Sequence, residues 1–338
     1  MKAENGETII VHQTPPLTAN PSTNDWYAQS LKSEIALSRW LSHCTSLPVP
    51  RVLHTSWASP EQPCNVSTSQ KLSGEPLHVI YGSLSTESKE NLVRSFAQHA
   101  VTLFELDIPQ QIGSVDAGAT AAELAVIPAL GREPKMRVPK VCNTLEEGIA
   151  EVTFIKRRAL TADRTTDEKF RSQATVSQLC RHLQGISQAW NERPALLRCT
   201  IAHRNPRASN LFVDREGRIT GVLGWRHHVI MPALLGAEYP PWLRDNGIYD
   251  PQFGYMLPPQ LESPEESARL RAIYAEAVKE RNTDYHTALI EGVKFREALE
   301  WLQDPHDDPG CGRLRNWMIQ TFGHAPQPAI DDKQCIIA

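Results

Sequence analysis

A short segment in the second half of the chain carries residues that could act on a phosphate or a hydroxyl group. It begins with His203 and reaches Asn210 seven positions later. Three arginines lie within it or beside it: Arg204, Arg207 and Arg226. Guanidinium groups bind phosphate oxygens, and histidine can transfer protons near neutral pH. The acids of the segment, Asp214 and Glu216, are typical turn residues, so the pattern indicates anion binding more than acid–base catalysis.

This segment also has the pattern of a β-hairpin. Two apolar runs of strand length lie within residues 211–223, and Gly217 in the turn between them can adopt a positive φ. Such a hairpin would bring Asn205, Asn210 and Gly224 close together at its mouth. We therefore expect one site, built by the loop before the hairpin and the turn after it.

The surrounding chain predicts mainly helices. Apolar residues recur at helical spacing from Trp26 to Cys44, from Ser85 to about Asp107, from Asp167 to Trp190, after a capping box at Ser263, and in one further helix that carries Leu289, Val293, Leu299 and Leu302. Strands are predicted at Glu7–Val11 and Asn65–Leu72, and residues 108–140 look like loop with at most brief helix.

This order predicts a two-lobed α+β fold. We expect a reduced N-terminal lobe over residues 1–78, a larger helical lobe over 79–328 that contains the hairpin segment 196–226, and a tail over 329–338. Two-lobed folds bind ligands in the cleft between their lobes, so a small molecule is the expected partner.

Charge and cysteine content exclude several other classes. The chain has 338 residues and a net charge of -4, so nucleic acid is not an expected partner. Its seven cysteines form no C-x-x-C pair, which argues against a disulfide framework and a zinc site. No signal peptide or apolar run of ~18 residues occurs, so we expect a cytoplasmic protein.

The hairpin segment resembles the catalytic loop of the aminoglycoside phosphotransferase family, a branch of the protein-kinase-like fold. That loop has the form H-x-D-x-x-x-x-N and is followed by an I-D-W-like triplet, which here correspond to His203 to Asn210 and to Leu223-Gly224-Trp225. SEIALSRWLSHCTSLPVPRVL resembles the family's helix with a lysine-pairing glutamate, at Glu34. KLSGEPL, IGSVD and EYPPWL also resemble family segments, the last two those of fungal members. The resemblance covers about residues 25 to 245 and implies a kinase-like (APH) fold.

The chain departs from this family at the positions that carry the family's catalytic and metal-binding aspartates. The loop aspartate that positions the acceptor hydroxyl is Asn205 here, and the magnesium-binding aspartate of the triplet is Gly224. The nucleotide-contacting lysine would fall near His12, and no glycine-rich phosphate loop precedes it. An amide cannot take a proton at neutral pH, and glycine offers no metal ligand. We therefore expect no metal and no cofactor.

These departures leave several hypotheses open. The first is a degenerate family member of fungal small-molecule metabolism, as the resemblance implies. It would bind a small molecule either as a non-phosphotransfer tailoring enzyme or as a pseudokinase. The second is an active ATP- and magnesium-dependent kinase in which Arg204, Arg207 and Asn210 compensate. Among single residues, His203 is either catalytic or a brace for the loop, and Arg207 and Arg226 are either substrate-binding or solvated. Trp225 is expected in the core, and His227 and His228 as a surface or packed pair.

The chain ends in Cys335-Ile336-Ile337-Ala338, which has the form of a C-a-a-X prenylation motif. One prenyl group supports only reversible membrane association, and the preceding DDKQ is not polybasic. A prenyl-anchored interaction protein is therefore a third hypothesis.

Overall fold

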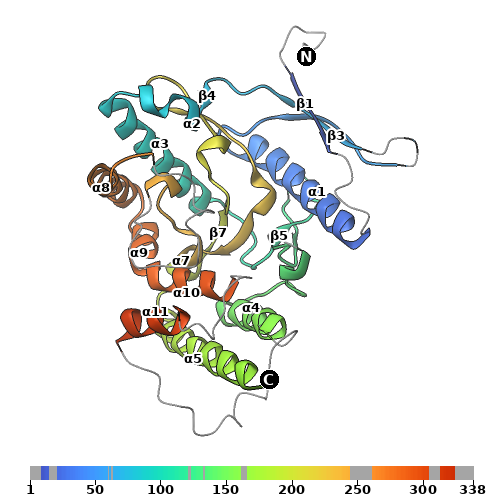
Figure 1. The fold of residues 1–338 in the computed structure, drawn as a ribbon. Helices are drawn as coiled ribbons and strands as arrows, with labels where there is room; N and C mark the ends of the chain where they lie inside the picture. Colours follow the sequence, from blue (N-terminus) through green and yellow to red (C-terminus); the bar gives the residue numbers. More distant parts are fainter. Residues whose placement is uncertain are drawn as a thin grey trace.

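The computed structural model describes residues 9–14, 21–59, 61, 64–120, 123–131, 134–160, 166–243, 261–303 and 313–323. A small three-stranded antiparallel sheet lies at the N-terminal end, in the order β1 (Ile9–Thr14), β3 (Asn65–Gln70) and β2 (Val52–Ser56). The long helix α1 (Pro21–Cys44) lies between this sheet and the rest of the molecule (Figure 1). The strands predicted near residues 7–11 and 65–72 are thus present among the described residues.

The larger part is helical, as predicted. Its helices are α2 (Leu77–Ile80), α3 (Thr86–Glu105), α4 (Leu145–Leu160), α5 (Thr166–Trp190), α6 (Pro194–Leu197), α7 (Ala233–Gly236), α8 (Pro264–Arg281), α9 (Thr283–Glu291), α10 (Val293–Gln303) and α11 (Arg313–Phe322). Ser85 and Ser263 begin α3 and α8 as N-caps, because each side chain accepts a hydrogen bond from a backbone N–H three residues on. The two-lobed α+β prediction is confirmed by this arrangement.

One predicted helix is in fact two. α9 ends at Glu291 and α10 begins at Val293, with Gly292 between them. The Arg296 guanidinium donates to the carbonyl oxygens of Ala288 and Leu289 at 2.9 and 2.6 Å. These hydrogen bonds satisfy carbonyl groups in the last turn of α9. A Cβ on Gly292 would lie within 2.5 Å of the Ala288 carbonyl oxygen. The apolar spacing continues across the break, so periodicity alone did not reveal it.

The hairpin lies at the centre of the molecule. β8 (Leu211–Val213) pairs with β9 (Ile219–Val222) and with β4 (Glu75–Pro76), while β7 (Cys199–Ala202) pairs with β10 (Val229–Pro232). Gly217 has φ 81°, as its turn requires, and packs against the backbone of α3. The segment expected to be loop holds a short strand pair, β5 (Ser114–Val115) and β6 (Val126–Ile127). In the part of the chain that the structure describes, no helix has the length and apolar character to cross a membrane.

Candidate functional site

The loop between β7 and β8 and the turn after β9 are joined by short hydrogen bonds. The Leu223 N–H donates to the Asn210 carbonyl oxygen at 2.8 Å, and the Asn210 Nδ2 donates to the Asn205 carbonyl oxygen at 2.9 Å. Both bonds follow from the hairpin, which places the end of the loop beside the start of the turn. The structure therefore brings Asn205, Asn210 and Gly224 together as predicted from the sequence.

His203 spans this junction. Its Nδ1 accepts from the Asn205 N–H at 3.2 Å, so its Nε2 carries the proton and donates to the Leu223 carbonyl oxygen at 2.7 Å. Its ring also packs on Trp225, with centroids 4.4 Å apart. Burial lowers the pKa of His203 to about 4. With both nitrogens bonded and the ring neutral, the contacts of His203 are those of a brace.

Gly224 adopts a left-handed backbone conformation and has the Asn210 side chain directly beside it. Its φ is 78°, in the left-handed region. A Cβ built on Gly224 would lie 2.5 Å from the Asn210 Nδ2, so the Asn210 amide fills the space where a carboxylate side chain would begin. Together with the amide at Asn205, this arrangement does not fit a magnesium ion bound as the resembling family binds it. Among the described residues, no three His, Cys, Asp or Glu side chains gather into a metal site.

Arg226 is bound to α1. Its Nε lies 3.1 Å from the Glu34 Oε2, its Nη1 donates to the Tyr27 hydroxyl oxygen at 2.6 Å, and its guanidinium carbon lies 4.6 Å from the Tyr27 ring centre. Burial raises the pKa of Glu34, although Arg226 and, more weakly, His12 lower it. His12 itself is exposed on β1. Glu34 thus has an ion-pair partner, but that partner is Arg226 instead of the lysine implied by the resemblance.

Arg204 also has an acidic partner. Its Nη1 lies 2.9 Å from the Glu238 Oε1, and its side chain is only 8% exposed. Its Nη2 donates to Gln303 Oε1 at 3.4 Å, which ties the loop to the end of α10. Its φ of 59° lies in the left-handed region, which residues other than glycine adopt only uncommonly. Arg204 therefore meets a carboxylate of its own chain.

Arg207 differs from the other two arginines. It is exposed, and its guanidinium contacts no carboxylate among the described residues. Of the three predicted anion-binding arginines, Arg207 is therefore available to a ligand without breaking an ion pair. Cys335 lies outside the described residues.

His228 is packed inside the protein, which is one of the two alternatives expected for it from the sequence. It is buried, its Nδ1 lies 2.6 Å from the Trp225 carbonyl oxygen, and its Nε2 accepts from the Val115 N–H at 3.1 Å. Burial lowers its pKa to about 4. This histidine joins the turn to β5. Trp225 is buried, as expected.

The partners Tyr27 and Glu238 were also missed by sequence reasoning. Glu238 opens the quoted EYPPWL segment, but nothing in its spacing points to Arg204, 34 positions earlier. Tyr27 precedes Glu34 by two helical turns and so lies on the same face of α1, which is a local signal that could have been used.

Comparisons with known proteins agree with this fold. The family described as "Phosphotransferase enzyme family" matches residues 17–235. A protein of Ampulloclitocybe clavipes, "Clavilactone A biosynthesis cluster protein Y", is 32% identical over 323 residues, which cover 94% of this chain and 78% of that protein. A thermostable mutant of aminoglycoside phosphotransferase APH(4)-Ia, in a ternary complex with ADP and hygromycin B, has a TM-score of 0.51 at 14% identity and covers 94% of this chain and 87% of its own.

Proposed function

The chain belongs to the phosphotransferase enzyme family, and on that premise we propose that it binds a small metabolite between its lobes without transferring phosphate from magnesium-bound ATP. The proposal rests chiefly on Gly224. Glycine has no side chain that could bind a metal, and the Asn210 amide lies in the space beside it.

The expected loss in the rate of phosphoryl transfer is large enough to support this proposal. Phosphoryl transfer depends mainly on positioning and charge neutralisation, and a metal ion contributes several kcal/mol to the latter. Each ~1.4 kcal/mol changes the rate about tenfold. Without a metal ligand at Gly224 or a carboxylate at Asn205, ordinary kinase activity should be lower by several orders of magnitude.

Arginines do not offer an equivalent replacement. An active kinase with a non-standard site would need Arg204, Arg207 or Arg226 to neutralise phosphate oxygens. Arg204 and Arg226 are held by Glu238 and Glu34, so a phosphate would have to displace a carboxylate from each. The active-kinase hypothesis is therefore the weaker one.

The biological setting follows from the relative. The printed name of this relative assigns it to a fungal biosynthesis cluster. Its sequence is similar to this one over almost the whole of this chain. We place the present protein in fungal small-molecule biosynthesis, as a tailoring enzyme of other chemistry or as a pseudokinase. These two roles differ in whether a metabolite is changed after it binds.

The test is a calorimetric titration with ATP, with and without magnesium, followed by incubation with γ-labelled ATP and an extract of the producing fungus. We expect no magnesium-dependent heat and no labelled product. Because a ligand of the native state raises stability by mass action, melting curves provide an independent readout. Magnesium-dependent stabilisation, or transfer of label to a metabolite, would overturn the proposal.

Prenylation of Cys335 is a separate proposal that rests on the C-terminal motif alone. A Cys335→Ser variant expressed in a fungal host should lose any membrane-bound fraction. If the distribution between membrane and supernatant does not change, the lipid has no part in localisation.

A further inference from the structure

Helix α1 lies between the small sheet and the larger helical lobe (Figure 1), and it packs mainly against the helical lobe. Its residues Ala36, Leu37, Trp40 and Leu41 are buried in the same core as residues of α3 and of the hairpin. By contrast, no residue described in β1, β2 or β3 is fully buried. Burial of apolar surface therefore holds α1 to the helical lobe much more strongly than it holds the sheet to α1.

Polar contacts also join α1 to the helical lobe. Near the start of the helix, the Trp26 Nε1 donates to the Leu130 carbonyl oxygen at 2.8 Å. In its middle, the Ser33 hydroxyl donates to the Val115 carbonyl oxygen. The contacts of Arg226 described above reach the same helix. Because these partners all belong to the helical lobe, α1 is fixed to that lobe along much of its length.

The partner of Glu34 shows to which lobe α1 is tied. In the resembling family this glutamate pairs with a lysine, and the position of that lysine falls near His12 on β1. His12 is exposed, and it lowers the pKa of Glu34 less than Arg226 does. Arg226, with its Nε 3.1 Å from the Glu34 carboxylate, is the direct partner. The charge pair that would tie α1 to the sheet thus ties it to the helical lobe.

The side-chain contacts between α1 and the sheet are exposed or half-buried. The Arg39 guanidinium donates to the Thr55 hydroxyl oxygen at 3.1 Å, and the Lys32 Nζ lies 5.2 Å from the centre of the Trp57 ring. Hydrogen bonds and cation–π contacts at such positions are weak, because water competes for the same groups. These contacts can therefore break and form again without unfolding either part.

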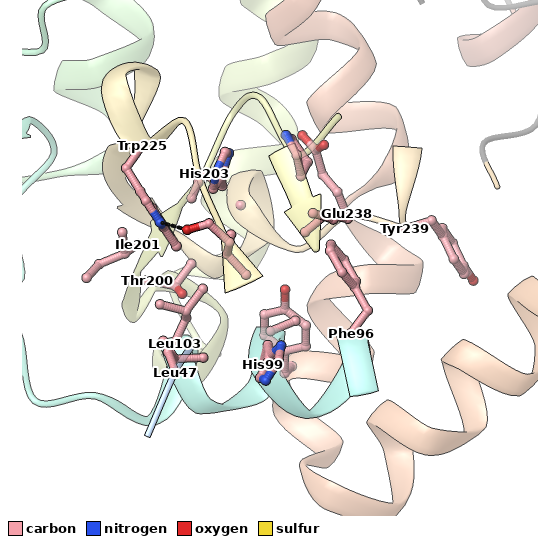
Figure 2. Close-up of a pocket in the computed structure, with 17 residues that line it drawn as sticks. Leu47, Phe96, His99, Leu103, Thr200, Ile201, His203, Trp225, Glu238 and Tyr239 are labelled. Carbon is pink, nitrogen blue, oxygen red and sulfur yellow. Dashed lines mark hydrogen bonds between the residues drawn. The ribbon is translucent and has the colours of Figure 1, made fainter. Parts of the chain in front are cut away.

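The chain that follows α1 is still held by the helical lobe. Leu47 lines the same cavity as Leu103 of α3, as Figure 2 shows. One residue later, the Val222 N–H donates to the Pro48 carbonyl oxygen at 2.8 Å. The sheet therefore becomes separate from the helical lobe only after Pro48.

Two short links join the sheet to residues that are anchored in this way. The first is residues 49–51, which lead into β2. The second begins at Lys71, after β3, and ends at Ser73, whose carbonyl oxygen accepts a hydrogen bond of 2.7 Å from the Thr220 hydroxyl. Changes in the backbone angles of a few such residues are enough to move a sheet as one body. Residues 15–20, which link β1 to α1, lie outside the described residues.

We propose that α1 is a fixed part of the helical lobe and that the sheet of β1, β3 and β2 is a lid, which swings on these two links and controls access to Gly224 and to the Arg226–Glu34 pair. The dividing line of the molecule then runs between α1 and the sheet, so Glu34 stays in place whether the lid is open or closed. That the lid admits a metabolite rests on the function proposed above. The movement itself needs no ligand and is measured on the protein alone, so its failure is distinguishable from the failure of that function.

Double electron–electron resonance between pairs of nitroxide labels measures this movement. His54→Cys on β2 with Arg94→Cys on α3 reports on the sheet against the helical lobe, and Asp25→Cys on α1 with Arg94→Cys reports on α1 against the same lobe. All three positions are exposed. We expect a broad distance distribution with more than one maximum for the first pair and a single narrow distribution for the second. Cysteines that are not buried among the described residues, or that lie outside them, are first replaced by serine: Cys44, Cys64, Cys311 and Cys335.

Two variants separate the parts of the proposal. Trp57→Ala removes the contact with Lys32, so it should shift the first distribution towards its longer distances and leave the second unchanged. Arg226→Ala removes the partner of Glu34, so it should broaden the second distribution. Both variants keep the buried core of α1, so the chain should still fold.

Phe154→Ala and Arg315→Ala are the matched controls, because each removes an aromatic or an arginine side chain at an exposed position of the helical lobe. Neither should change either distribution. Two narrow distributions in the unaltered protein would overturn the proposal, since no part would move. A broad distribution for both pairs, or a change of the second distribution in Trp57→Ala, would also overturn it, because α1 would then move with the sheet.

Discussion

The two sides of the loop that begins at His203 differ in whether their polar side chains have partners within the protein. In the turn after the hairpin, Arg226 is paired with Glu34, and the Asn210 amide fills the space beside Gly224. On α3, on the other side of the loop, the His99 Nδ1 is buried and has no hydrogen-bond partner among the described residues. The positions that bind phosphate and metal in the resembling family are thus occupied by contacts within the chain, whereas the His99 Nδ1 is unpaired within the part of the chain that the structure describes.

This contrast shows that contacts within the chain are enough to hold the loop in place. The loop is held by His203 and by backbone hydrogen bonds, which need no metal and no nucleotide. Internal contacts occupy the positions beside Gly224 and Arg226, and they satisfy polar groups that would otherwise be left unpaired. Four predictions would break or sharpen this comparison.

The largest expected effect is a loss of stability in mild acid. Burial lowers the pKa values of His99, His203 and His228 to about 4, below the ordinary 6.5. Between pH 6.5 and 4 the unfolded chain binds these protons and the folded chain does not, so the free energy of unfolding falls as the pH falls, and the loss levels off below pH 4. At about 1.4 kcal/mol per pKa unit, the loss is on the order of several kcal/mol.

Urea titrations at pH 7.5, 6 and 5 measure this loss. Burial also raises the pKa values of Glu34 and Glu297, which act in the opposite direction, but at two sites against three. A His203→Gln variant should show a shallower dependence on pH. Equal stability at pH 7.5 and 5 would contradict the assignment of three neutral histidines.

The next effect is expected at Gly224. Gly224→Asp displaces the Asn210 amide from its hydrogen bond to the Asn205 carbonyl oxygen and crowds the turn, so it should lower the free energy of unfolding by about 2–3 kcal/mol. It should not create magnesium-dependent nucleotide binding. Gly224→Ala is the control, because it tests the backbone and the Cβ contact without a carboxylate. A stable Gly224→Asp protein that binds magnesium-ATP would mean that the missing acid was the sole defect.

Breaking the ion pair with α1 should have a smaller effect. Arg226→Ala leaves the Glu34 carboxylate, 17% exposed, without its partner and should lower the free energy of unfolding by about 2 kcal/mol. Adding Glu34→Gln to this variant should restore part of the loss, since the unpaired charge is removed. Chemical denaturation of the single and double variants gives the coupling, and simple additivity would show that the pair has no energetic role.

Arg207→Ala should have the smallest effect on stability, within about 0.5 kcal/mol, because the side chain is exposed and unpaired among the described residues. If the loop binds an anionic metabolite, this variant should weaken that binding while its melting temperature stays the same. A large drop in melting temperature would show that Arg207 has a structural role instead.

Much of the framework was predictable because its signals are local. The capping serines, the helical periodicity and Gly217 in the hairpin turn depend on residues within a few positions of one another, and they identified α1, α3, α5, α8 and the hairpin. The break at Gly292 was not predictable in this way, because it depends on Arg296 and on the packing of α7.

The sequence by itself determined which side chains are missing: an amide stands at 205 and a glycine at 224, and no fold can supply the absent carboxylates from those positions. Only the tertiary structure decided what fills the gap. Arg226 meets Glu34 across 192 positions, and His99 lies against a loop about a hundred residues away. Such partners are set by how helices and strands pack, and packing depends on the shape of the whole core and not on the spacing within any one segment.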